Sequence, residues 1–149
     1  MVTLSHAQFQ QWLDRYVAAW KSYDPQAIGD LFSDGAWYRY HPEDEPVTGR
    51  SAIVADWLDG PDEPGTYDGR YEPLAIDPTN GHHVARGWTR YFTTAGDLRD
   101  EYWNVYLVTF DDEGLASSFT EWWIQDREFA HMASVAAVDR ALAKAGGAA

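Results

Sequence analysis

The segment at residues 101–125, EYWNVYLVTFDDEGLASSFTEWWIQ, constrains the fold more than any other part of the chain. Aromatic and β-branched residues alternate there with a period of two, which is typical of β-strands, and residues 111–114 have the composition of a turn. We therefore predict a long β-hairpin. The side chains expected on its inner face are Asn104, Tyr106, Val108, Phe110, Phe119, Glu121 and Trp123. Those expected on its outer face are Trp103, Val105, Leu107, Thr109, Trp122 and Ile124.

Both faces of this hairpin are largely apolar, so both should be covered in the folded protein. On the inner face, the carboxyl group of Glu121 would lie among tryptophans and tyrosines, and this placement needs an explanation. On the outer face, Trp103 and Trp122 would form an exposed apolar pair. We expect a second copy of the chain to cover them, giving a homodimer through the outer face of the sheet.

Composition restricts the classes of protein to which the chain can belong. A length of 149 residues, with 45% hydrophobic residues, is enough for one domain with a full core, so we predict a single domain over residues 1–149. The net charge of −13 repels nucleic acids and anionic membranes. Without cysteine, no disulfide framework or thiolate chemistry is possible. No signal peptide or membrane-spanning run is recognisable, so we expect a soluble, cytoplasmic protein.

Two helices are predicted before the first strand. Ser5 and Gln8 have the spacing of a capping box, and apolar residues at helical spacing follow over about 16 residues. Asp24-Pro25 is the start signal of a second helix, which we expect to bury Leu31 and Phe32 and to end at residues 34–35.

The remaining elements give the fold class. We predict strands at residues 36–41, 70–76 and 84–93, with Pro73 marking an edge or a bulge. We also predict a short third helix capped by Thr48 or Ser51, an irregular loop at 59–69 that forms a rim or lid, and a C-terminal helix at 128–144. The order indicates an α+β fold: a cone-shaped, strongly bent antiparallel sheet wrapped on the long N-terminal helix, with two short helices and a C-terminal helix.

Several segments together resemble a known family. They are RYVAAWKSYDPQAIGDLFSDGAWYRYHP, PVTGRSAIVADWL, VTFDDEG and FTEWW. In this order they are similar to the nuclear transport factor 2-like superfamily, and most of all to its SnoaL-like branch. The resemblance implies the cone-shaped fold, a pocket at its open end and a dimer formed sheet to sheet. It implies no single activity, because this scaffold carries isomerases, dehydratases, cyclases, epoxide hydrolases and binding proteins.

Two enzyme groups of this superfamily suggest roles for particular residues. Similarity to ketosteroid isomerase implies that Tyr16 is an oxyanion donor, and it places Tyr40 and Tyr106 where that enzyme has acids. A phenol is a poor base at neutral pH, which argues against the isomerase mechanism. Similarity to limonene epoxide hydrolase places Glu121 at the position of a catalytic acid. The arginine and acid that this hydrolase also uses have only approximate counterparts in Arg90 and Glu101.

Glu121 allows two interpretations. In an aromatic pocket its charged form would be disfavoured, its pKa would rise and it would exchange protons near pH 7. Alternatively, it forms an ion pair with Arg86 or Arg90, or it faces solvent. Asn104 is expected either to contact a ligand or to hold Glu121 in place.

The other candidate residues are also open to structural interpretations. Tyr16 and Tyr40 are expected to act with Glu121 in catalysis, and the residues expected to contact a substrate are Trp57, Trp88, Asn104, Tyr106, Phe119 and Trp123. Aromatic residues at such positions are often simply part of the core. His82 and His83 lack the spacing of a metal site and are expected to be surface residues, so no metal is predicted. His41 is expected to cap the loop at 42–46 or, alternatively, to shuttle protons.

The sequence therefore predicts a protein that binds a small hydrophobic molecule in a pocket. The first hypothesis is a cofactor-free lyase, isomerase or hydrolase with Glu121 as general acid/base. The alternative is a non-catalytic binding protein that uses the same pocket. Neither hypothesis involves nucleic acid, a membrane or a cofactor.

Overall fold

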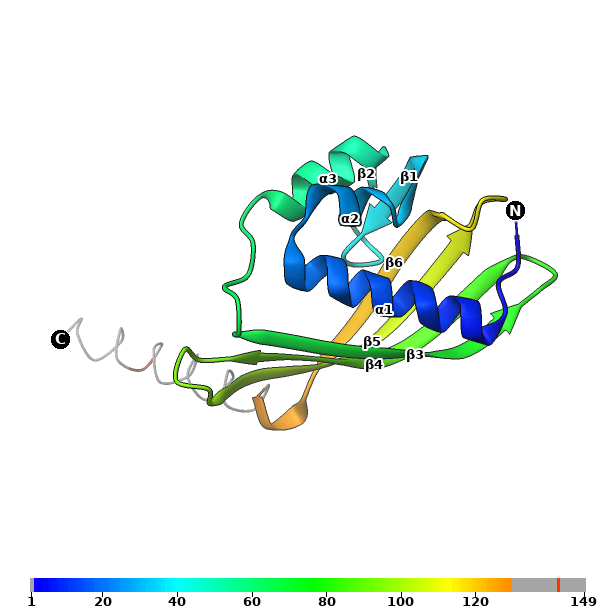
Figure 1. Ribbon diagram of the computed structural model, residues 1–149. Helices are drawn as coiled ribbons and strands as arrows, with labels where there is room; N and C mark the ends of the chain where they lie inside the picture. The colour runs from blue at the N-terminus through cyan, green and yellow to red at the C-terminus, as the bar shows by residue number, and fades with distance from the viewer. Residues whose placement is uncertain (1, 130–141, 143–149) are drawn as a thin grey trace.

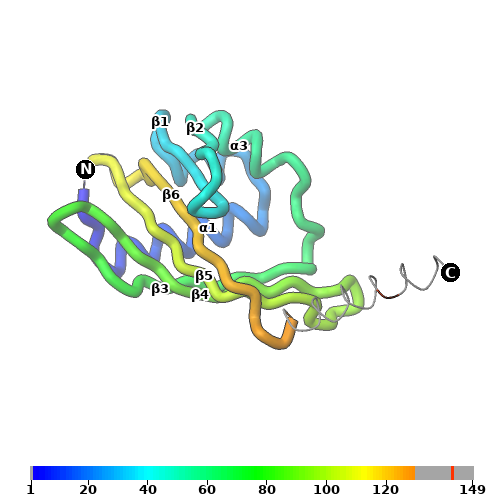
Figure 2. The backbone as a smooth tube through the Cα atoms, turned by 180° about the vertical axis from the view of Figure 1, so that it is seen from behind, coloured from blue at the N-terminus to red at the C-terminus, as the bar shows by residue number. Residues whose placement is uncertain are grey.

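The structure is a computed structural model that describes residues 2–129 and 142, and its centre is a six-stranded sheet (Figure 1). The helices are α1 (His6–Ser22), α2 (Pro25–Gly29) and α3 (Arg50–Leu58). The strands are β1 (Phe32–Arg39), β2 (Val47–Thr48), β3 (Tyr67–Asp77), β4 (His82–Phe92), β5 (Leu98–Phe110) and β6 (Ala116–Gln125). Their order in the sheet is β2-β1-β6-β5-β4-β3. Figures 1 and 2 show α1 lying across one face of the sheet, with α3 near β1 and β2 at one end.

The sheet is mixed, and the prediction of a purely antiparallel sheet is wrong at one pair of strands. β1 runs parallel to β6, with Tyr38 opposite Phe119, whereas the other neighbouring strands are antiparallel. The parallel pair arises because the chain leaves β1, builds β2, α3 and the strands β3, β4 and β5, and returns beside β1 only with β6. The predicted cone shape, strong bend and single-domain organisation stay predictions. Most of the predicted C-terminal helix lies outside the described residues.

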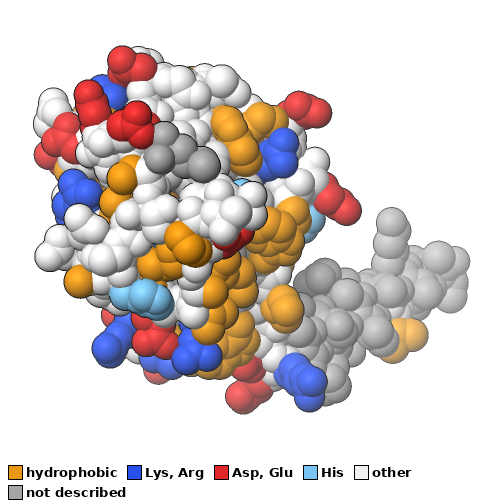
Figure 3. Space-filling model, turned by 90° about the vertical axis from the view of Figure 1, so that its right-hand side faces the viewer, with side chains coloured by type: hydrophobic (Ala, Val, Ile, Leu, Met, Phe, Trp, Pro, Cys, Tyr) orange, Lys and Arg blue, Asp and Glu red, His pale blue; other side chains and the backbone are white. Residues whose placement is uncertain are grey.

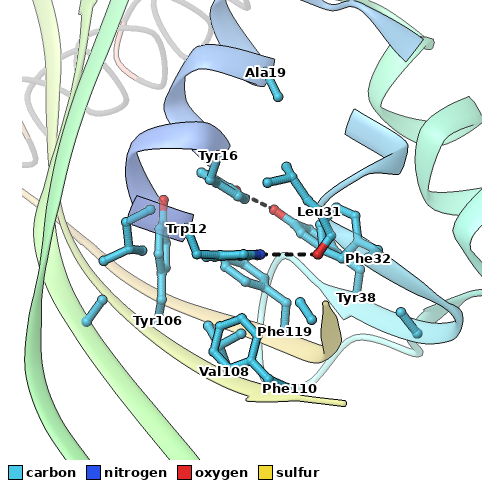
Figure 4. Close-up of a cluster of buried hydrophobic side chains, with 14 of the residues drawn as sticks. Trp12, Tyr16, Ala19, Leu31, Phe32, Tyr38, Tyr106, Val108, Phe110 and Phe119 are labelled. Carbon is cyan, nitrogen blue, oxygen red and sulfur yellow. Dashed lines mark hydrogen bonds between the residues drawn. The ribbon is translucent and has the colours of Figure 1, made fainter. Parts of the chain in front are cut away.

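Helix α1 begins as its sequence predicts. The backbone N–H of Gln8 donates to Ser5 Oγ, and Gln8 Oε1 accepts from the backbone N–H of Ser5, so the capping box is complete. The buried face of the helix carries Phe9, Trp12, Leu13, Tyr16 and Ala19. Trp12 Nε1 donates to the carbonyl oxygen of Leu31 at 3.1 Å, which satisfies its only polar atom in the centre of the core (Figure 4).

The second helix starts at Asp24-Pro25 as predicted, but its predicted end and the predicted cap of the third helix are wrong. α2 ends at Gly29, and Phe32 is already part of β1, because the neighbouring carbonyl of Leu31 accepts from the backbone N–H of Ala116 in β6. Pairing with a distant strand therefore overrides the local helical pattern. α3 follows Gly49, which has a φ of 98° and makes no side-chain cap, so neither Thr48 nor Ser51 caps this helix.

The central hairpin is confirmed in its register and in the direction of its side chains. Asn104 lies opposite Trp123, Tyr106 opposite Glu121, and Val108 opposite Phe119. Pro73 lies on the edge strand β3 beside an irregularity in its pairing with β4, as predicted. Within residues 2–129 and 142, no helix has both the length and the apolar character needed to cross a membrane.

Gly87 on β4 allows the backbone of β3 and the Tyr71 side chain to approach closely. A Cβ atom at this position would come within 2.0 Å of the carbonyl oxygen of Arg70 and 2.5 Å of the Tyr71 ring. Only glycine can occupy this site without displacing the backbone of β3.

We predict that Gly87→Ala destabilises the protein by more than about 3 kcal/mol, because the clash is with neighbouring backbone rather than with a movable side chain. Urea unfolding measures the change in the free energy of unfolding. Gly35→Ala is the matched control, since a Cβ at Gly35 meets no atom within 4 Å. Equal stability of Gly87→Ala and the wild type would contradict the close approach.

Candidate functional site

A cavity of about 590 Å³ opens between α1, α3 and the inner face of the sheet. Its buried inner wall consists of Tyr16, Tyr38, Trp57, Tyr71, Thr89, Asn104 and Tyr106. The more accessible lining residues are Trp20, Tyr23, Tyr40, Asp56, Asp59, Gly60, Asp62, Tyr91, Arg99, Asp100, Tyr102, Glu121 and Trp123. This combination of aromatic walls and a few polar groups is typical of sites for small molecules.

Glu121 lies on the inner face of β6 and lines the cavity. Its Oε1 accepts a hydrogen bond of 2.6 Å from Asn104 Nδ2, and burial raises the pKa of its carboxyl group to about 7, although this hydrogen bond opposes the rise. A carboxyl group with such a pKa exchanges protons readily at neutral pH.

The alternative placements of Glu121 are wrong. Arg86 pairs with Glu72, and Arg90 pairs with Glu101. The strand alternation puts both arginines on the outer face of β4, away from the cavity. The Arg90–Glu101 pair therefore lies too far from the inner wall to serve as the arginine and acid of an epoxide hydrolase site.

Tyr16 and Tyr38 form a pair of phenols in the inner wall. Their hydroxyl oxygens are 2.6 Å apart, and the two residues come from α1 and β1 (Figure 4). Burial raises the pKa of both groups well above the usual value, and the nearby Glu121 raises it further. Both phenols therefore stay protonated at neutral pH and can donate hydrogen bonds, but they cannot act as bases.

Tyr38 was not among the residues predicted for the site. It is two positions before Tyr40, so both side chains point to the same face. Tyr40 lies just beyond β1, with 40% of its surface exposed, and its hydroxyl donates to Asp56 Oδ2 at 2.6 Å. Tyr40 thus lines the outer part of the cavity, and its hydroxyl proton is used in the hydrogen bond to Asp56. Tyr38 occupies the deeper position beside Tyr16.

Most of the predicted site residues meet around the cavity. Those that line it are Tyr16, Tyr40, Trp57, Asn104, Tyr106, Glu121 and Trp123. Two predicted residues do not. Trp88 lies on the outer face of β4, opposite Trp103, with the Arg90 guanidinium 4.1 Å from its ring centroid. Phe119 is fully buried and stacks on Tyr38 with ring centroids 4.5 Å apart, so it supports the wall from behind.

The acidic residues at the accessible end of the cavity were not predicted. Asp56, Asp59, Asp62 and Asp100 lie there with a single basic residue, Arg99. Among the described residues, no salt bridge neutralises any of these aspartates. Their combined field disfavours an anionic ligand. The only sequence signal was the acidic, irregular loop at 59–69, which was expected to form a rim.

That loop is connected to α1 by hydrogen bonds. Asp62 Oδ2 accepts from Trp20 Nε1 at 3.0 Å and from the Tyr23 hydroxyl at 3.1 Å. These contacts place Asp62 at the wall of the cavity. Movement of the loop as a lid stays a prediction.

His41 and His83 have structural roles, whereas His82 is exposed, as expected. His83 is fully buried, contrary to the expected surface position, and its Nε2 accepts from the backbone N–H of Leu4 at 2.9 Å. His41 Nδ1 accepts from the backbone N–H of Glu43, so the capping interpretation of His41 is confirmed. Across residues 2–129 and 142, no three His, Cys, Asp or Glu side chains are grouped closely enough to hold a metal ion.

The raised pKa of Glu121 predicts a specific dependence of stability on pH. In the unfolded chain the group ionises near its ordinary pKa of 4.5, whereas in the folded protein it ionises near 7. The folded state therefore holds the extra proton between these values, and stability falls as pH rises through this window.

We predict that Glu121→Gln removes this loss. Its free energy of unfolding relative to the wild type should rise by about 2–3 kcal/mol between pH 4.5 and pH 8. Urea unfolding at several pH values measures this difference. The control is Glu72→Gln, which changes an exposed ion pair with Arg86. A relative stability of Glu121→Gln that is independent of pH would contradict the raised pKa.

The chain is similar to a known family of domains and to a solved structure. A family model described as a SnoaL-like domain matches residues 13–119. No protein with a curated description matches. A solved structure, an NTF-2 like protein of unknown function from Burkholderia xenovorans LB400, is similar with 16% identity and a TM-score of 0.60. The match covers 80% of this chain and 85% of that chain. At this identity the likeness shows the fold alone.

Proposed function

Because the chain belongs to the family of SnoaL-like domains, we propose that it acts on a small, mostly apolar molecule held in the cavity, with Glu121 as general acid/base. The reaction would be that of a cofactor-free lyase, isomerase or hydrolase. The observation that carries this proposal is a carboxyl group with a pKa of about 7 on the wall of an aromatic cavity.

The proposed chemistry needs one group that accepts a proton and a separate group that donates a hydrogen bond and stays protonated. The ionised carboxylate of Glu121 removes a proton from a carbon next to a carbonyl, or from a water molecule. The hydroxyls of Tyr16 and Tyr38 share one hydrogen bond, which uses one of their two protons. The other phenol O–H of the pair then donates to the substrate oxygen on which negative charge develops. Because Glu121 becomes neutral as that oxygen becomes negative, the net charge of the cavity is unchanged in the step.

The charge of the lining residues narrows the class of substrate. Four aspartates and one arginine line the cavity beside Glu121. A carboxylate or phosphate ester would meet repulsion on entering, whereas a neutral ketone, alcohol or epoxide would not. We therefore propose a neutral substrate with one or two oxygen functions.

A non-catalytic binding protein is the second candidate. Tyr40 and Tyr106 favour this candidate, because they occupy the two positions at which proteins resembling ketosteroid isomerase have acids. Burial raises the pKa of the Tyr106 phenol well above its usual value, so it cannot replace an acid. In this case Glu121 would hold a ligand by a hydrogen bond without transferring a proton.

We predict that neutral terpenoid and polycyclic ketones or alcohols raise the melting temperature in a thermal-shift screen, and that matched carboxylates do not. For a ligand that is turned over, Glu121→Gln should bind within about threefold of the wild type but lose at least about 100-fold in kcat. Glu72→Gln should match the wild type in both measurements.

The outcomes separate the two candidate functions. Undiminished turnover by Glu121→Gln would show that Glu121 is not the acid/base. Binding by the wild type without any turnover of the bound compounds would instead identify a binding protein.

We also propose that the outer face of the sheet forms a homodimer. The face carries Trp103, Trp122 and Ile124 with 48%, 41% and 73% of their surfaces exposed. Trp103 lies opposite Ile124, and the exposed Val105 lies opposite Trp122. Figure 3 shows a band of hydrophobic side chains on one side of the molecule, bordered by charged ones. An isologous contact between two copies would cover both sets of tryptophans at once.

We predict that the wild type sediments as a dimer in analytical ultracentrifugation and that the double variant Trp122→Glu/Ile124→Glu sediments as a monomer, because charges would be buried at the contact. The control is Leu58→Glu on α3, where the leucine is also exposed. A monomeric wild type at all tested concentrations would overturn the dimer.

A further inference from the structure

A row of hydrogen-bonded side chains crosses four adjacent strands and ends at Glu121. The Tyr71 hydroxyl on β3 lies 2.5 Å from Thr89 Oγ1 on β4. Thr89 Oγ1 lies 2.9 Å from Asn104 Oδ1 on β5, and Asn104 Nδ2 lies 2.6 Å from Glu121 Oε1 on β6. Tyr71, Thr89 and Asn104 are buried, so water contributes little to these bonds.

The chemistry of the donors fixes the direction of this row. The amide oxygen of Asn104 can only accept, so the single hydroxyl proton of Thr89 must point to it. Thr89 Oγ1 must then accept from the hydroxyl of Tyr71. Every proton in the row therefore points toward Glu121, and the amide N–H of Asn104 is held as a donor to the carboxylate.

This direction distinguishes the two oxygens of Glu121. Oε1 accepts from Asn104, and among the described residues no hydrogen bond reaches Oε2. If the amide of Asn104 turned over, its carbonyl would face Oε1 and would favour the protonated carboxyl instead. Turning over would also reverse the row, because the Thr89 hydroxyl would accept from the amide N–H and its own proton would point to Tyr71. The buried Tyr71 hydroxyl would then lose Thr89 as its acceptor, which opposes the turn.

We propose that Thr89 is a positioning residue which, through Asn104, holds an N–H donor on Glu121 Oε1 and leaves Oε2 as the atom that takes up and releases the proton. Tyr71 supports Thr89 in the same way. The positioning of Asn104 by Thr89 does not depend on the proposed function. Only the catalytic use of Oε2 rests on the proposed function.

The phenols that face Glu121 stay protonated near neutral pH. Burial raises the pKa values of six phenols around the cavity, and the charge of Glu121 raises them further. They are Tyr16, Tyr38, Tyr40, Tyr71, Tyr91 and Tyr106. The charged residues that line the same cavity are Asp56, Asp59, Asp62, Arg99 and Asp100. A change in the titration of Glu121 on altering Thr89 would therefore not come from any of these six phenols.

The test is a titration of the Glu121 side-chain carboxyl carbon, followed by NMR with ¹³C-labelled glutamate and assigned with Glu121→Gln. Asn104→Leu removes the donor, and its midpoint should rise by about one pH unit. Thr89→Val should raise the midpoint by a smaller amount in the same direction. Thr89→Ser keeps the hydroxyl and should titrate like the wild type.

The double variant Thr89→Val/Asn104→Leu shows whether Thr89 acts through Asn104. Its midpoint should equal that of Asn104→Leu alone. The proposal would be overturned if Thr89→Val shifted the Glu121 midpoint equally in the wild type and in Asn104→Leu. It would also be overturned if Thr89→Val shifted the midpoint in neither. If Thr89→Val does not fold, Thr89→Ala takes its place under the same criteria. The titration needs no substrate, so it separates failure of this proposal from failure of the proposed function.

Discussion

The packing of α1 against the inner face of β5 and β6 is the interaction on which the rest of the structure depends. Trp12, Phe110 and Phe119 are fully buried between them, and Tyr16 stacks on Phe119 with ring centroids 5.3 Å apart. This aromatic packing fills the inner face at one end of the hairpin. The same inward-facing row of side chains then continues to Glu121, which lines the cavity instead of the core.

The wall of the cavity combines groups of fixed protonation with one group that titrates. Burial keeps the phenols of Tyr16, Tyr38 and Tyr106 protonated, because it disfavours the charged phenolate. The same physical effect raises the pKa of Glu121 to about 7 and so brings it into the range where proton exchange is useful. Environments that separate the pKa values of neighbouring groups in this way are how sites assign donors and bases.

Much of the inner wall follows from local patterns in the sequence. Period-two alternation placed Asn104, Tyr106 and Glu121 on one face, and the register of the hairpin agrees. The same reasoning was insufficient for Trp88, because an aromatic strand residue carries no local mark of which face meets α1. It was also insufficient for Phe32, which has a helical spacing but pairs with β6.

The sequence by itself determined the hairpin, the capped first helix, the position of Pro73 at an edge and the family to which the chain belongs. These depend on periodicity, on capping and on turn residues, which act over a few neighbours in the chain. Only the tertiary structure decided that Tyr16 meets Tyr38 and that Thr89 meets Asn104. Such contacts depend on strand order and register between distant segments, and a hydrogen bond of this kind leaves no spacing in the sequence from which to predict it.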